Sequence, residues 1–153
     1  TKGIKLIHIT GDGEYKSVLS QLGITDGNGL GDSSVILPYL HDMPKALAAA
    51  DLAVFRSGAI GLAELAVRGI PSVLVPYPYA AEDHQTYNAR IFVQEGAAHM
   101  IVDQMLSAHD LIGEIEMFMA NRDLLSQMGE RALQLGKPNA AHDIAKLALS
   151  IAK

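Results

Sequence analysis

Two stretches of the chain carry groups that could hold a phosphorylated sugar. The first runs from Arg56 to Glu64, and the second places His84, Gln85 and Asn88 in the opening turns of an expected helix. Free amides at the start of a helix, together with the helix dipole, bind anions such as phosphate. Amide, imidazole and carboxylate side chains form hydrogen bonds with hydroxyl groups. These residue types could therefore hold a phosphate group and form hydrogen bonds with the hydroxyls of a sugar.

The first stretch joins an apolar strand to a helix through the range Gly58–Gly61. Ser57 is expected to cap that helix, and Gly58 lets a ligand approach the first turn closely. Arg56 would either add positive charge to the site or pair with a nearby carboxylate. Glu64 lies on the second turn, where it is either an ordinary exposed residue or a carboxylate that accepts hydrogen bonds from a ribose diol.

The second stretch follows a Pro-Tyr-Pro-Tyr loop and begins a helix at Glu82 or Asp83. His84, Gln85 and Asn88 then fall within the first turns, with Asn88 one turn beyond His84. Such a cluster could form hydrogen bonds with several hydroxyls of one sugar. The alternative interpretation is a solvated helix start, and the spacing alone somewhat favours that alternative.

These stretches need elements that bring them together, and the chain alternates short apolar strands with helices. The expected strands are 4–10, 35–37, 52–55, 72–75 and 99–102, and the expected helices are 14–22, 44–50, 58–68, 83–94 and 107 onward, with a break near 136–138. This pattern predicts an α/β fold with a Rossmann-like parallel sheet and helices on both faces. Ligands bind beyond the carboxyl ends of such strands, which directs attention to the loops after Thr10, Leu37, Phe55 and Val75.

Length and composition exclude several classes of function. A chain of 153 residues predicts a single domain over 1–153, and a net charge of -5 argues against nucleic-acid binding. The absence of Cys excludes disulfides and thiol chemistry. The chain also lacks the His-Glu-x-x-His pattern of zinc-dependent proteases, so the sequence gives no sign of a catalytic metal site. The turn Gly11-Asp12-Gly13 has Lys16 in place of the third glycine of a dinucleotide fingerprint, so we expect a tight turn there. We expect no cofactor and no metal ion.

Several blocks of sequence resemble the MurG family, the bacterial N-acetylglucosaminyltransferases that convert lipid I to lipid II in peptidoglycan synthesis. The blocks are Arg56-Ser57-Gly58-Ala59, Ala63-Glu64-Leu65-Ala66, Gly69-Ile70-Pro71, Val75-Pro76-Tyr77-Pro78 and Asp83-His84-Gln85-x-x-Asn88-Ala89. The resemblance covers nearly the whole chain and lies in the donor-binding domain, which is the C-terminal half of a GT-B glycosyltransferase. A looser form of the same layout occurs in other GT-B enzymes and in nucleotide-sugar 2-epimerases.

The resemblance implies roles for residues along the first stretch. The amides of Ala59 and Ile60 would meet the diphosphate of UDP-N-acetylglucosamine (UDP-GlcNAc), and Glu64 would bind the ribose hydroxyls. Gly61 stands where some members have a threonine, so the hydroxyl contact of those members is lost here or replaced by backbone.

The resemblance also implies residues for the sugar and the base. His84 and Gln85 would read the hydroxyls of GlcNAc, although some members have glutamine in place of His84. The backbone of Leu40 would meet the uracil, and Tyr39 falls where the family places an aromatic side chain beside the nucleotide. No catalytic residue is expected within this chain.

The chain begins at Thr1 and enters an apolar strand almost at once, so we expect it to be a piece of a longer protein. By resemblance, an N-terminal domain and the first βα unit of this domain are missing. The missing domain would bind the lipid I acceptor, supply the general base and make most of the membrane contact at the cytoplasmic face of the plasma membrane. The alternatives are a UDP-GlcNAc 2-epimerase and a non-catalytic nucleotide-sugar-binding subunit.

Overall fold

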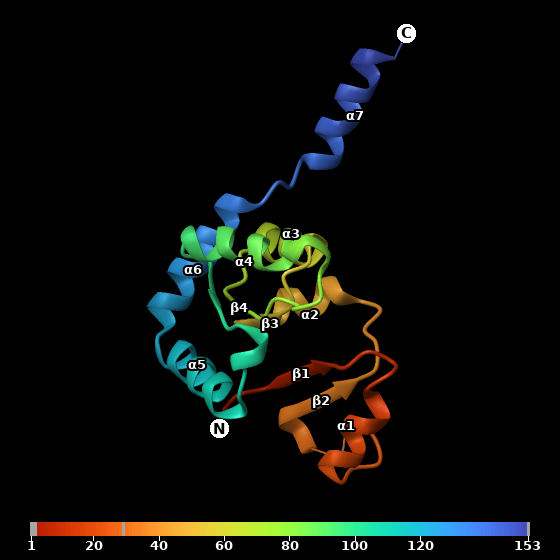
Figure 1. Cartoon of the computed structure of the whole chain (residues 1–153), viewed down its shortest axis with the longest axis vertical. Helices are drawn as coiled ribbons and strands as arrows, with labels where there is room; N and C mark the ends of the chain where they lie inside the picture. The colour runs from red at the N-terminus through yellow and green to blue at the C-terminus, as the bar shows by residue number, and fades with distance from the viewer. Residues whose placement is uncertain (1–2, 29, 153) are drawn as a thin grey trace. The chain divides into compact units, whose positions relative to one another are not determined.

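The computed structural model describes residues 3–28 and 30–152, which divide into two compact units, Thr1–Ala49 and Ala50–Lys153 (Figure 1). The strands of the described residues pair in two separate parallel sheets, one in each unit. The α/β class with parallel strands is thus confirmed, and a single domain over the whole chain stays a prediction.

The first unit contains one pair of parallel strands. Its elements are β1 (Leu6–Ile9), α1 (Tyr15–Leu22), the 3-10 helix η1 (Gly31–Ser33), β2 (Ser34–Leu37) and α2 (Met43–Ala49). Leu6 lies opposite Ser34, and Ile9 opposite Leu37. α1 ends at Gly23, whose φ of 67° lies in the left-handed region that glycine adopts without strain.

The second unit contains a three-stranded parallel sheet in the order β3-β4-β5. Its elements are β3 (Ala53–Phe55), α3 (Ala59–Arg68), β4 (Ser72–Leu74), η2 (Ala81–Asp83), α4 (His84–Gln94), β5 (Ala98–Met100), η3 (Asp103–Met105), α5 (Ala108–Ala120), α6 (Arg122–Leu135) and α7 (Ala140–Ile151). Because the strands are parallel, the loops that follow them lie at one edge of the sheet.

The core of the second unit packs the central strand against two helices. Val73 of β4 is fully buried in a cluster with Phe118 of α5 and with Leu125 and Met128 of α6. α3 packs on α6 where two glycines meet, and a Cβ on Gly129 would lie 2.6 Å from a backbone oxygen. This close packing fixes the position of α3 against α6, and α3 is the helix whose start forms the candidate site.

The observed strands and α-helices follow the expected ones within one or two residues, with one additional break, and η1, η2 and η3 were not predicted. The expected long helix after 107 is interrupted at Asn121, whose side chain caps α6 by accepting a hydrogen bond from the N–H of Leu124 at 3.0 Å. Asparagine favours such caps because its short side chain reaches a free amide. The break near 136–138 is confirmed between α6 and α7.

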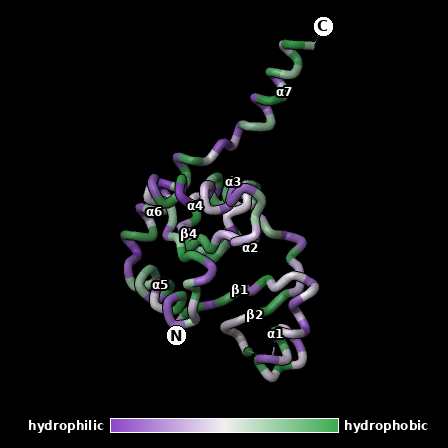
Figure 2. Tube along the Cα trace, in the orientation of Figure 1, coloured by the Kyte–Doolittle hydropathy of each residue, from purple (hydrophilic) through white to green (hydrophobic). Residues whose placement is uncertain are grey.

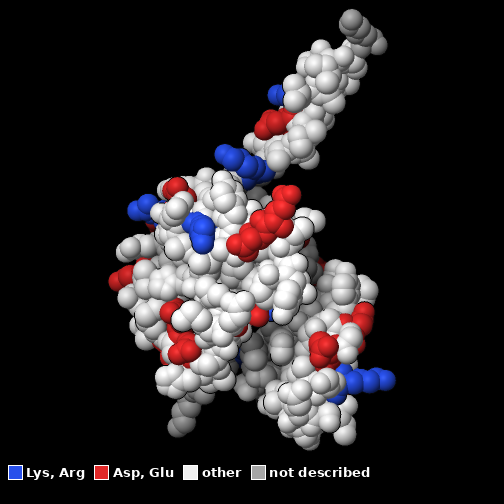
Figure 3. Space-filling view, viewed as in Figure 1, with Lys and Arg blue, Asp and Glu red and all other residues white. Residues whose placement is uncertain are grey.

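α7 buries none of its residues, although apolar side chains recur along it (Figure 2). Within the described residues, no helix combines the length and the apolar character needed to cross a membrane. On the face seen in Figure 3, acidic and basic side chains are interspersed.

Candidate functional site

The start of α3 presents three backbone amides that have no partner within the helix. β3 leads through Arg56 and Ser57 to Gly58, the residue before the helix, and the first helical hydrogen bond runs from the N–H of Leu62 to the Gly58 oxygen at 3.0 Å. The amides of the three preceding helical positions are therefore left free. No side chain caps this end and no acidic residue lies in its first turn, so the positive end of the dipole is not neutralised locally.

Ser57 does not cap α3, and the expectation that it would is wrong. Its side chain is fully buried, and its hydroxyl donates to the backbone oxygen of Gln85 at 2.8 Å. The Asn88 side-chain amide donates in turn to the backbone oxygen of Ser57 at 3.2 Å. Ser57 thus joins the start of α3 to the start of α4, because its hydroxyl donates to a backbone oxygen of the neighbouring helix and makes no capping hydrogen bond with its own helix.

Gly61 packs closely against the ring of Phe55, the last residue of β3. A Cβ at this position would lie 2.6 Å from Cε1 of Phe55, which is far inside van der Waals contact. The aromatic ring therefore fills the space that a larger side chain at position 61 would need. A side chain at position 61 would therefore have to displace the ring.

The start of α4 carries acidic side chains and two strained residues. Glu82 and Asp83 both have φ of 52°, a left-handed conformation that is rare outside glycine. The Asp83 carboxylate accepts a hydrogen bond from the Thr86 hydroxyl at 2.6 Å. Strain of this kind persists only where surrounding contacts impose it and is common at ligand-binding sites. The negative charge here makes this end less suited to phosphate than the start of α3.

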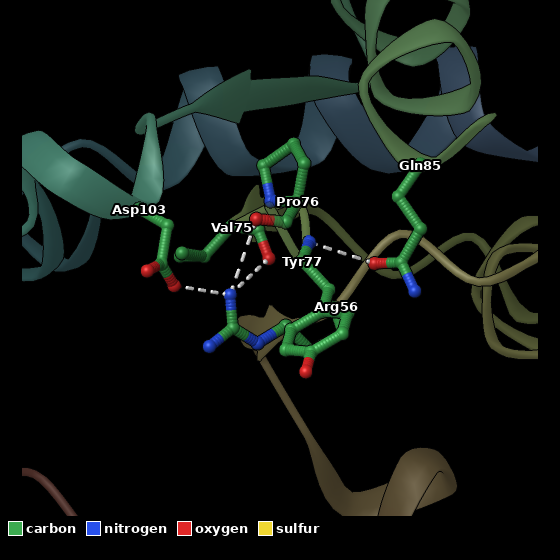
Figure 4. Close-up of polar contacts among 6 residues, drawn as sticks. All are labelled: Arg56, Val75, Pro76, Tyr77, Gln85 and Asp103. Carbon is green, nitrogen blue, oxygen red and sulfur yellow. Dashed lines mark hydrogen bonds and ion pairs between the residues drawn. The ribbon is translucent and has the colours of Figure 1, made fainter. Parts of the chain in front are cut away.

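His84 and Gln85 present complementary groups to a ligand. The Nδ1 of His84 lies 2.7 Å from the backbone oxygen of Ala81, which only accepts, so in the tautomer that makes this hydrogen bond Nδ1 carries the proton and Nε2 is the acceptor. The Gln85 side-chain oxygen Oε1 accepts the N–H of Tyr77 at 3.0 Å, which leaves its NH2 group as a donor (Figure 4). An acceptor on His84 and an NH2 donor on Gln85 suit the hydroxyls of a sugar, which both donate and accept hydrogen bonds.

Arg56 pairs with a carboxylate, which is one of its two expected roles. Its Nη1 lies 2.5 Å from Oδ1 of Asp103 and donates to the backbone oxygens of Val75 and Pro76 at 3.1 and 3.2 Å (Figure 4). The guanidinium carbon also lies 5.7 Å from the centre of the Tyr77 ring. Arg56 therefore ties together the carboxyl ends of the three strands.

The remaining expected site residues fall into two groups. Glu64 is exposed on α3, four residues after Ile60 and therefore on the same face of the helix, and Ile60 itself is 80% exposed. Tyr39 and Leu40 belong to the first unit, where Tyr39 is exposed and contacts the ring of His41. The roles of Tyr39 and Leu40 in the site stay predictions.

A shallow groove of about 210 Å³ lies between α3 and α4, with Ala59, Ala63 and Phe92 in its wall. Its lining is apolar except for Asn88, and it contains neither Glu64 nor Gln85. The polar groups of the site thus gather at the edge of the sheet rather than in this groove. Among residues 3–28 and 30–152, no three His, Asp or Glu side chains are grouped as metal ligands would be.

The role of Asp103 and the contacts of Phe55 and Tyr77 were not predicted from the sequence. Asp103 opens η3 in the loop after β5, beyond the carboxyl end of that strand, where ligand-binding residues of parallel sheets gather. In the sequence, Phe55 looks like any apolar strand residue and Tyr77 like any loop residue. No pattern therefore predicts that Phe55 contacts Gly61 or that the N–H of Tyr77 binds Gln85.

Comparison with known proteins yields one matching family and a set of relatives. The family described as the glycosyltransferase family 28 C-terminal domain matches residues 1–147. The UDP-N-acetylglucosamine--N-acetylmuramyl-(pentapeptide) pyrophosphoryl-undecaprenol N-acetylglucosamine transferase of Desulforamulus reducens is 40% identical over 147 residues, which are 94% of this chain and 39% of that protein. The protein of the same description from a Thermoanaerobacter species is 38% identical over 150 residues, which are 98% of this chain and 41% of that protein.

The fold is similar to that of a solved enzyme. The crystal structure of Acinetobacter baumannii MurG matches with a TM-score of 0.79 and 29% identity, covering 95% of this chain and 42% of the other. The chain thus spans about two fifths of the length of the curated relatives it matches.

Proposed function

Because the chain belongs to the glycosyltransferase family 28 C-terminal domain family, we propose that it binds UDP-GlcNAc as the sugar donor of an N-acetylglucosaminyltransferase. The relatives at about 40% identity are described as transferases of N-acetylglucosamine, which supports this donor. We propose that the acceptor is lipid I and the product lipid II, since the description of those relatives names N-acetylmuramyl-(pentapeptide) pyrophosphoryl-undecaprenol. The reaction would then take place at the cytoplasmic face of the plasma membrane.

The observation that carries the proposal is the free start of α3. Three amides without helical partners, no capping side chain and no carboxylate in the first turn form a site for a diphosphate. Glu64 would accept hydrogen bonds from the ribose hydroxyls, since it is exposed on the same face as Ile60. The sugar would lie toward the start of α4, where His84 offers an acceptor and Gln85 a donor.

In this proposal the chain's own contribution to catalysis is electrostatic. The acceptor hydroxyl attacks the anomeric carbon of GlcNAc, and the bond to UDP breaks, so negative charge grows on the leaving diphosphate. The free amides at the start of α3 would face that charge, and removing one such donor from an enzyme costs about 3 kcal/mol in the barrier. The base that takes the hydroxyl proton is proposed to come from the part of the relatives that this chain does not span.

The test is the replacement Glu64→Ala, measured by titration calorimetry with UDP. A charge-assisted hydrogen bond to the ribose is lost, so UDP affinity should fall by roughly 1–3 kcal/mol. Glu64→Gln keeps an oxygen acceptor and should lose less. Glu130→Ala removes an equally exposed glutamate from α6 and serves as the control, with no expected change. Equal UDP affinity of Glu64→Ala and the wild type would remove Glu64 from the site, and absence of UDP binding by the wild type would reject the proposal.

A further inference from the structure

A single guanidinium holds the carboxyl ends of all three strands of the second unit. Arg56 follows β3, the two carbonyl oxygens that it contacts follow β4, and Asp103 opens η3 after β5. All three contacts are made by one nitrogen, Nη1. The position of this nitrogen therefore depends on every partner, and Asp103 supplies the only charged one among them.

The contacts of Arg56 continue to the side chain of Gln85 through a single peptide unit. The carbonyl of Pro76 and the N–H of Tyr77 belong to the same planar peptide and point in opposite directions. Arg56 holds the carbonyl end of this peptide, and its N–H end donates to Oε1 of Gln85 at 3.0 Å (Figure 4). Any rotation of the peptide plane that moves one end also moves the other. The direction of the Tyr77 N–H is thus coupled to the place of the guanidinium.

Asp103 is the partner that keeps the guanidinium in this place. The Arg56 side chain is 49% exposed, so water competes for its donors, whereas the Asp103 side chain is 29% exposed. A hydrogen bond between charged groups is stronger than one to a neutral carbonyl and restricts the long arginine side chain. Without the carboxylate, Nη1 would exchange the two carbonyl oxygens for water more readily.

We propose that Asp103 is a positioning residue, which acts through Arg56 and the Pro76–Tyr77 peptide to orient the side-chain amide of Gln85. With Oε1 committed to Tyr77, Gln85 presents only its NH2 donors, so it recognises acceptor oxygens on the sugar of the donor and rejects groups that can only donate. This inference rests on the proposed binding of UDP-GlcNAc. It assigns to Asp103 a role in sugar recognition and none in holding the diphosphate.

The test compares the affinities for UDP-GlcNAc and for UDP, which lacks the sugar. Replacement Asp103→Ala should weaken UDP-GlcNAc binding by about 3- to 10-fold, the range expected for disturbing one hydrogen bond to the sugar, and should leave UDP affinity within about twofold. Asp103→Asn is nearly isosteric and keeps an acceptor for Arg56, so it should lose less and guards against a folding defect. The control is Asp51→Ala, which breaks the exposed ion pair with Arg122 at 3.1 Å just before β3, and it should change neither affinity.

A double-mutant cycle shows whether Asp103 acts through Gln85. In a Gln85→Ala background, Asp103→Ala should cause no further loss of UDP-GlcNAc affinity, because the amide that it orients is gone. Equal weakening of UDP and UDP-GlcNAc by Asp103→Ala would mean a merely structural role, and additive losses in the cycle would mean an independent one. Either result overturns the inference while UDP binding by the wild type upholds the proposed function. A wild type that does not bind UDP overturns both.

Discussion

The contact between Gly61 and Phe55 leads to a prediction on stability. In Gly61→Ala the new methyl group would lie 2.6 Å from the ring of Phe55. Carbon atoms prefer separations of ~3.5–4.0 Å, so the ring must move aside by about 1 Å. Overpacking of this kind costs typically 1–3 kcal/mol, and the gain in helix propensity from glycine to alanine returns about 1 kcal/mol. The net expectation is a loss of about 1 kcal/mol in the free energy of unfolding.

Equilibrium unfolding in urea measures this change, and α5 offers a matched control. Gly113 is also a helical glycine, but a Cβ there meets nothing within 4 Å. Gly113→Ala should therefore gain about 0.5–1 kcal/mol from propensity alone. The two substitutions introduce the same methyl group, so the difference of about 2 kcal/mol between them isolates the cost of displacing the ring.

The reasoning can be refuted by shortening the neighbouring side chain. In a Phe55→Val background the ring is absent, so Gly61→Ala should become stabilising, with a favourable coupling energy of about 2 kcal/mol. If Gly61→Ala has the same effect in both backgrounds, the ring does not determine the residue at position 61.

Two further predictions concern serine hydroxyl groups. Ser57→Ala removes a buried hydrogen bond to α4 and should destabilise the protein by about 1–2 kcal/mol in urea unfolding. Its control is Ser72→Ala, which removes an equally buried hydroxyl that has no partner among the described residues and should be neutral or stabilising. Ser107→Ala removes the hydroxyl that holds the pKa of Asp110 below its ordinary value, so that pKa should rise in an NMR titration. A carboxylate whose pKa is lowered by folding contributes stability at neutral pH, and this contribution is lost as the pH falls through that pKa. The part of the difference in free energy of unfolding between wild type and Ser107→Ala that depends on Asp110 should therefore disappear in acid.

The helix start that carries the proposed phosphate site could be predicted because its cause is local. An apolar strand followed by Gly58 and a helical pattern produces free amides wherever it occurs, and the structure has them at the expected place. Ser57 was misjudged for the opposite reason. A serine beside a helix start can cap it or turn away, and the neighbouring helix decides, since it brings the oxygen of Gln85 within 2.8 Å.

The order of elements, the free start of α3 and the polar cluster on α4 were thus determined by the sequence alone, because strand and helix patterns and turn residues act over a few positions. The pairing of Arg56 with Asp103, 47 residues away, and the orientation of the Gln85 amide were decided only by the tertiary structure. Each of these side chains has several chemically acceptable partners. The partner that it takes depends on which strand ends the parallel sheet brings together, and that choice is a property of the packed fold.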